Sequence, residues 1–137
     1  MKSKLFGTQI NLPNGVNLSN IYSIRNGKLW AVDKKGFLFF ADLNIKPNPS
    51  YKPFPEINQC EAIFVSNDGE FCLVRTKQQH YHIFYSNLVP YITPIPPGII
   101  ITCATCINVA NRPKPLVFMG TNLGQVTFFD LNRDYLM

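Results

Sequence analysis

The chain has 137 residues, of which 46% are hydrophobic and 13% aromatic, whereas only 15% are charged. Intrinsic disorder requires few aromatic residues and much charge, so this composition excludes it. Lys and Arg number 13 against 8 Asp and Glu, a basic excess of +5, and a surface so poor in charge suggests that something else covers part of it.

The first predicted elements surround a strong hairpin signal. Asn26-Gly27 is a dipeptide whose two residues readily adopt the positive φ angles of a tight two-residue turn. A second turn follows at residues 33–36. The predicted strands of this set cover residues 21–25, 28–32 and 37–43.

Two further sets of three strands follow along the chain. The predicted strands of the second set cover residues 61–66, 70–76 and 80–86, and those of the third cover 100–109, 116–121 and 125–131. The most apolar run, residues 98–110, is shorter than the roughly 20 residues of a membrane-spanning helix. No stretch has a sustained helical period, so we expect almost no helix.

The three sets are copies of one repeat. The segment GFLFFADLN, which begins at Gly36, matches GQVTFFDLN, which begins at Gly124, 88 residues later. A weaker copy lies between them, at Asn67–Asn87, so the period is about 44 residues, within the range of propeller blades.

A looser extended segment precedes each set, and the last two are rich in proline, which is confined mainly to sheet edges. We therefore predict an all-β chain with about three four-stranded antiparallel blades of a WD40-like β-propeller, and a β-sandwich or barrel is the alternative. Trp30 and the pairs Phe39-Phe40 and Phe128-Phe129 should be core between blades. The extended segments are residues 5–12, 51–57 and 90–96, and the repeats are roughly 5–44, 51–87 and 90–132 of a partial propeller spanning 1–137.

Three blades do not close a propeller, which typically takes about four to eight. An open arc leaves apolar faces and strand edges unpaired. We therefore expect the chain to be part of a larger propeller, with closure by association as the other option.

Cys103 and Cys106 form a CxxC pair, a spacing found in redox and metal sites. On a strand, however, residues three apart point to opposite faces, and zinc would need two further ligands. We expect these two residues, together with Cys60 and Cys72, to be reduced thiols buried as small hydrophobic side chains.

His80 and His82 lie two apart on a predicted strand, so they share a face and could share a metal. No acidic residue or cysteine lies close in sequence to complete a site, which favours exposed or cross-strand-packed histidines. The sequence also contains no nucleophile triad and no phosphate-binding loop. We therefore predict no enzyme activity, no cofactor and no metal.

Lys34, Lys35 and Lys77 fall on corresponding turns of the first two copies, so they should gather on one rim. Such a basic rim could bind nucleic acid or an anionic lipid surface. Because the charge is spread over turns rather than along one stripe, solubilising lysines are the simpler interpretation, and nucleic acid is not the favoured partner.

Three segments follow one another along the chain: LFGTQINLPNGVNLSNIYSIRNGKLWAVDKKGFLFFADLN, EAIFVSNDGEFCLVR and PLVFMGTNLGQVTFFDLN. Their order resembles the N-terminal propeller of the vacuolar protein sorting-associated protein eighteen family. Ser66 and Gly69 look like the hairpin that precedes the family's last motif. The residues that fill its last motif are Gly120, Thr121, Gly124, Asp130 and Leu131.

This resemblance implies a core subunit of the class C tethering complexes HOPS and CORVET, which bridge endosomal, vacuolar or lysosomal membranes before fusion. The implied role is a protein-interaction scaffold without catalytic residues, whose partners are other tethering subunits. The expected location is the cytoplasm, peripheral on the late endosome and on the vacuole or lysosome membrane. The long α-solenoid and the zinc-binding RING domain of the family have no counterpart in this sequence.

Overall fold

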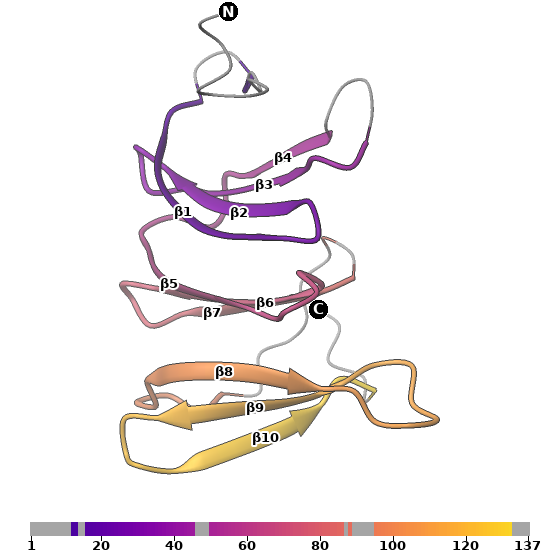
Figure 1. The fold of residues 1–137 in the computed structure, drawn as a ribbon. Helices are drawn as coiled ribbons and strands as arrows, with labels where there is room; N and C mark the ends of the chain where they lie inside the picture. Colours follow the sequence, from indigo (N-terminus) through magenta and orange to yellow (C-terminus); the bar gives the residue numbers. More distant parts are fainter. Residues whose placement is uncertain (1–11, 14–15, 46–49, 87, 89–94, 133–137) are drawn as a thin grey trace, which may run out of the picture.

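The computed structural model describes residues 12–13, 16–45, 50–86, 88 and 95–132, and this part of the chain contains ten strands and no helix. The strands form three antiparallel sheets stacked one on the next (Figure 1). The first sheet has the order β1-β2-β3-β4, the second β5-β6-β7 and the third β10-β9-β8. The predicted all-β class is therefore confirmed.

The bounds of the strands agree with the predicted ones to within a few residues. In the first sheet they are β1 (Leu18–Arg25), β2 (Lys28–Asp33), β3 (Leu38–Asp42) and β4 (Ser50–Phe54). In the second they are β5 (Cys60–Val65), β6 (Phe71–Thr76) and β7 (Tyr81–Tyr85). In the third they are β8 (Ile101–Ile107), β9 (Leu116–Thr121) and β10 (Val126–Asp130).

One predicted strand belongs to a different set from the one expected. The segment 51–57 was predicted to be the outer strand of the second set, but β4 pairs with β3, with Tyr51 opposite Ala41. Its Pro53 is tolerated there because β4 is the edge strand of the first sheet. The corresponding segments 5–12 and 90–96 lie mostly outside the described residues, within which the second and third sheets have three strands each.

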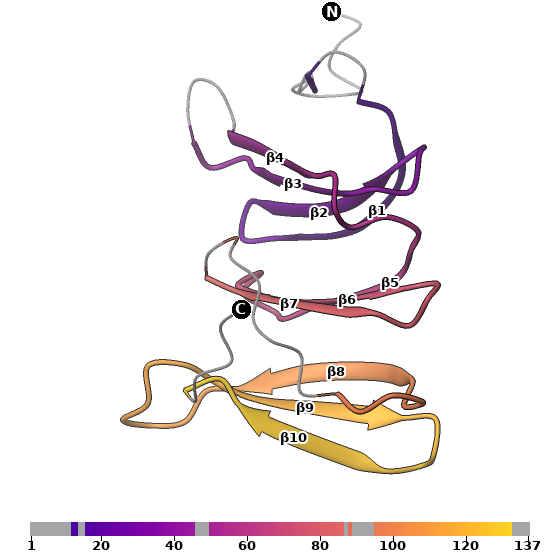
Figure 2. The ribbon, with the colours of Figure 1, turned by 180° about the vertical axis from the view of Figure 1, so that it is seen from behind.

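Three equivalent turns define the repeat in the structure. Each begins with a residue whose side-chain oxygen accepts the backbone N–H four positions later, and each has a positive φ three positions later, at Gly36, Gln79 and Gly124. The bonds are Phe37 N–H to Asp33 at 3.0 Å, His80 N–H to Thr76 at 3.2 Å and Gln125 N–H to Thr121 at 3.4 Å. These turns lie on one edge of the stack, left in Figure 1 and right in Figure 2.

The repeated Asp-Leu-Asn sequence has a structural reason. Asp42 accepts the backbone N–H of Asn44 at 3.0 Å, and the Asn44 amide donates to the Asn26 carbonyl at 2.7 Å. In the third sheet, Asp130 accepts the N–H of Asn132 at 2.9 Å, and the Asn132 amide donates to the Lys114 carbonyl at 2.8 Å. The motif therefore ties the end of the third strand of a set to the loop or turn that joins its first two strands.

The core consists of layers between the sheets. Between the first and second sheets, Trp30 packs with Phe54 and Phe84, and between the second and third, Leu73 packs with Val117 and Met119. The second sheet therefore buries both of its faces. Of the aromatic residues predicted to be core, Trp30, Phe39, Phe40 and Phe129 are buried, but Phe128 is exposed.

Candidate interaction surface

The third sheet exposes an apolar face on the side away from the second sheet, and we call it the outer face. Side chains alternate along a strand, and Val117, Met119 and Phe129 point toward the second sheet. The residues of opposite parity therefore form the outer face. They are Cys103, Thr105 and Ile107 of β8, Leu116, Phe118 and Gly120 of β9, and Val126, Phe128 and Asp130 of β10.

Residues at the equivalent positions of the first two sheets are buried. Counted from the three equivalent turns, Phe128 corresponds to Phe40 and Ile83, which are 8% and 0% exposed, whereas Phe128 is 61% exposed. Val126 corresponds to Leu38 and Tyr81, which are 0% and 9% exposed, whereas Val126 is 77% exposed. The outer face thus repeats a sheet-packing face, but no described residue covers it.

Two other outer-face groups extend this surface. Phe118 stacks on Phe128 with ring centroids 5.4 Å apart and planes 25° apart, and Ile107 is half exposed. Leu123, in the adjoining turn, is also exposed. A contiguous apolar patch of this kind on a soluble domain typically marks an interaction site.

At the other end of the stack, the chain covers its own sheet. Leu29, Ala31, Phe39 and Ala41 of the first sheet point away from the second sheet and are buried, with Leu12, Val16, Leu18 and Tyr51 among the residues packed against them. The two ends of the stack therefore differ, because only the third sheet presents a bare apolar face among the described residues.

The three lysines of the predicted basic rim lie on two neighbouring turns of the stack. Lys34 and Lys35 lie in the β2–β3 turn and Lys77 lies in the β6–β7 turn, and all three are exposed on the same edge of the stack (Figure 1). The equivalent positions of the third turn hold Asn122 and Leu123, so the basic character stops after the second sheet.

The two cysteines of the CxxC pair point to opposite faces, as predicted. Cys106 packs against the core between the second and third sheets, and burial raises the pKa of its thiol to about 12. Cys103 lies on the outer face, and its sulfur sits over Gly120, where an added Cβ would meet it at 2.7 Å. The predicted burial of all four cysteines is therefore wrong for Cys103, which is exposed, whereas Cys72 is buried and Cys60 and Cys106 are half-buried.

The two histidines are not on one strand, because β7 begins at Tyr81 and His80 belongs to the preceding turn. They line a polar hollow together with Glu56, a residue that sequence proximity could not reveal. Burial is the main cause that lowers the pKa of His82, His80 adds to this effect and Glu56 opposes it. Within the described residues, no group of three or more His, Cys, Asp or Glu side chains could hold a metal.

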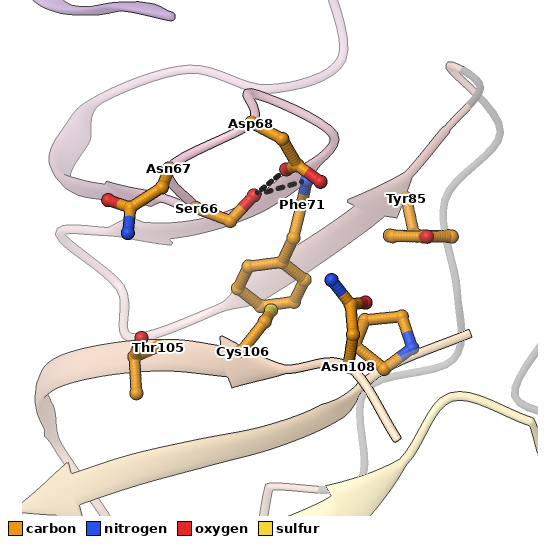
Figure 3. A pocket seen from close by; sticks show the side chains of 9 residues that line it. Ser66, Asn67, Asp68, Phe71, Tyr85, Thr105, Cys106 and Asn108 are labelled. Atoms are coloured by element: carbon orange, nitrogen blue, oxygen red, sulfur yellow. Dashed lines mark hydrogen bonds between the residues drawn. The ribbon is translucent and has the colours of Figure 1, made fainter. Parts of the chain in front are cut away.

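A cavity of about 180 Å³ opens between the second and third sheets. It is lined by the β5–β6 turn, which lies on the edge of the stack opposite the basic turns (Figure 1). Its lining is mostly polar and includes Ser66, Asn67 and Asp68 from the β5–β6 turn, and Asn108, which follows β8. Phe71 forms part of its wall (Figure 3).

No family model matches the chain, and no curated protein matches it either. No helix in the described part of the chain has the length and apolarity that a membrane crossing requires.

Proposed function

We propose that the three sheets are consecutive blades of a WD40-like β-propeller and that the chain is a protein-interaction scaffold. The outer face of the third sheet is the surface that binds. Its partner is a further β-sheet with an apolar face, packed as the second sheet packs on the first and the third on the second.

The observation that carries this proposal is the change in exposure at one repeated position. Phe40 and Ile83 are buried by the sheet that follows them, and Phe128 is 61% exposed. Burying an apolar surface contributes roughly 25 cal/mol for each Å² removed from water. An aromatic side chain in this position therefore favours the docking of another sheet strongly.

The finer assignment rests on the resemblance to the vacuolar protein sorting-associated protein eighteen family. In that role the chain is part of a HOPS or CORVET tethering subunit, and its partners are other subunits of the complex. It acts in the cytoplasm, peripherally on late endosomes and on the vacuole or lysosome, during docking and fusion of vesicles.

Co-expression tests this function directly. The full chain is co-expressed with the core subunits of a class C tethering complex, and the mixture is separated by size-exclusion chromatography with light scattering. We expect the wild-type chain to elute with a subunit and the Phe128→Glu variant to elute alone. Ile24→Glu is the matched control, because Ile24 is 54% exposed on β1, away from the outer face, and this variant should still bind.

Two results would contradict the proposal. In the first, the wild-type chain elutes apart from every subunit, which removes the tethering assignment. In the second, Phe128→Glu binds as well as the wild type, which shows that the outer face is not the binding surface.

A further inference from the structure

The cavity between the second and third sheets has one charged group in its lining, the carboxylate of Asp68. Asp68 accepts hydrogen bonds from Ser66 Oγ at 2.7 Å and from the Glu70 N–H at 3.0 Å, both on Oδ1 (Figure 3 shows the Ser66 bond). Partial burial opposes ionisation of this carboxyl, but these bonds outweigh it and lower its pKa. Asp68 is therefore negatively charged at neutral pH.

Several polar atoms around the cavity have no hydrogen-bond partner in the described part of the chain. The bonds from Ser66 and Glu70 both reach Asp68 Oδ1 rather than Oδ2, and the side-chain amide of Asn108 neither donates nor accepts a hydrogen bond among the described residues. The ring of Phe71 forms part of the wall, and Tyr85 lines the side (Figure 3). A carboxylate oxygen, an amide oxygen and aromatic rings together form a lining that suits a cation.

The equivalent gap between the first and second sheets already contains a cation. There the Lys28 ammonium of β2 pairs with the Glu70 carboxylate just before β6. The hydrogen bond to Glu70 is the main cause that raises the pKa of Lys28. Burial opposes this rise, and the negative charges of Glu70, Asp42 and Asp68 add to it. A cavity of about 230 Å³ remains beside this pair, so a lysine ammonium lines the equivalent gap and pairs with a carboxylate there without filling the space.

The second gap has no lysine at this edge because the sequence changes at the two equivalent positions. Arg75 of β6 reaches across the gap only at the other edge, where it donates to the Ile101 carbonyl of β8. Phe71 takes the place of Lys28, because each lies five residues before the first residue of an equivalent turn, Thr76 and Asp33. In the same way Pro115 takes the place of Glu70, because each lies six residues before such a residue, Thr121 and Thr76. No ion pair of described residues crosses this gap, and the cavity occupies it.

We propose that this cavity binds the ammonium group of a lysine side chain supplied by a partner protein. The ammonium approaches Asp68 Oδ2 and the Asn108 amide oxygen, as Lys28 approaches Glu70 in the first gap. The aliphatic stem of the lysine lies along Phe71. This site is separate from the outer face of the third sheet, and neither proposal depends on the other.

A small lysine probe tests the site without an identified partner. Nα-acetyl-lysine methylamide is titrated into the ¹⁵N-labelled full chain, and the backbone amide shifts of residues 66–70 and 106–108 are followed by NMR. We expect saturable shifts that Nα-acetyl-norleucine methylamide, which has no charge, does not cause. Such shifts should weaken with added salt, because the contact is ionic.

Substitutions then locate the bound charge. Asp68→Asn keeps the acceptor for the turn hydrogen bonds and should weaken the lysine probe at least about fivefold. Asp33→Asn is the matched control, since Asp33 also accepts backbone N–H groups in a turn but lies on the opposite edge; this variant should bind normally. Equal weakening by both variants, or no weakening by Asp68→Asn, would overturn the proposal.

A second variant keeps the proposal testable if the turn tolerates Asp68→Asn poorly. Asn108 is exposed at the end of β8, so Asn108→Lys should fold normally. It supplies a tethered ammonium and should block the probe. If the probe still binds this folded variant with unchanged affinity, the cavity is not the lysine site.

Discussion

Phe118 and Phe128 stack on each other across β9 and β10, with ring centroids 5.4 Å apart, on a face that no described residue covers. Aromatic stacking of this kind contributes about 0.5–1.5 kcal/mol beyond area burial. Phe128 is nevertheless 61% exposed, and Phe118 is only half-buried. The pair is therefore better explained as half of a protein contact than as a complete core.

The first prediction compares two equivalent positions. Ile83→Ala should lower the free energy of unfolding by about 2–5 kcal/mol, because Ile83 is fully buried between two sheets. Phe128→Ala should lower it by less than about 1.5 kcal/mol, since mainly the stack on Phe118 is lost. Urea unfolding followed by the fluorescence of Trp30, the single tryptophan, measures both. Equal losses would mean that the outer face is covered in the isolated chain.

The second prediction concerns the repeated Asp-Leu-Asn sequence. The Asn132 side chain donates to the Lys114 carbonyl at 2.8 Å and accepts the Lys114 N–H at 3.0 Å. Asn132→Ala removes both bonds and should destabilise the chain by about 1–3 kcal/mol. Asn20→Ala is the control, because Asn20 is exposed on β1, and thermal unfolding should not change for it. A stable Asn132→Ala variant would show that the motif does not hold the third sheet together.

The third prediction uses the cysteines as reporters. At pH 8, iodoacetamide should modify Cys103 first, because it is exposed on the outer face. Burial raises the pKa of Cys60 to about 11 and that of Cys106 to about 12, so few of these thiols are reactive thiolates. Mass spectrometry of peptides over time gives the order, and a partner bound to the outer face should slow Cys103 alone. Faster labelling of Cys106 than of Cys103 would place the faces of β8 the other way round.

Much of the fold was predictable because the signals are local. Asn26-Gly27 does form a hairpin in which both residues have positive φ, and the alternation of apolar residues placed Trp30 and Phe40 in the core. The identity of the partner strand was not predictable for β4. A proline-rich edge strand has little pattern of its own, and chain order alone does not show which neighbouring sheet it joins.

The candidate site was predicted poorly for a different physical reason. Phe128 has the same local pattern as Phe40, and only its place in the last described sheet leaves it exposed. Glu56 and His82 meet through the fold rather than through sequence proximity, so the polar hollow was missed.

The fourth prediction concerns mild acid. Burial is the main cause that lowers the pKa of His82 in the folded chain. The charge of His80 lowers this pKa a little further, and the charge of Glu56 raises it. The unfolded chain, with an ordinary histidine pKa of about 6.5, then binds the proton more readily. The contribution of His82 to the free energy of unfolding is therefore fully present above about pH 6.5. It is lost progressively as the pH falls toward the pKa of His82 in the folded chain.

Thermal unfolding at pH 7.5 and 5.5 measures this effect. We expect the melting temperature to fall between these pH values in the wild type and to fall less in His82→Gln. His80→Gln should keep most of the decrease, because burial of His82 is the larger cause. Asp68, whose pKa is also lowered, contributes only at lower pH, below the ordinary carboxyl pKa of about 3.9. If His82→Gln shows the same decrease as the wild type, another group senses the acid and the assignment to His82 is wrong.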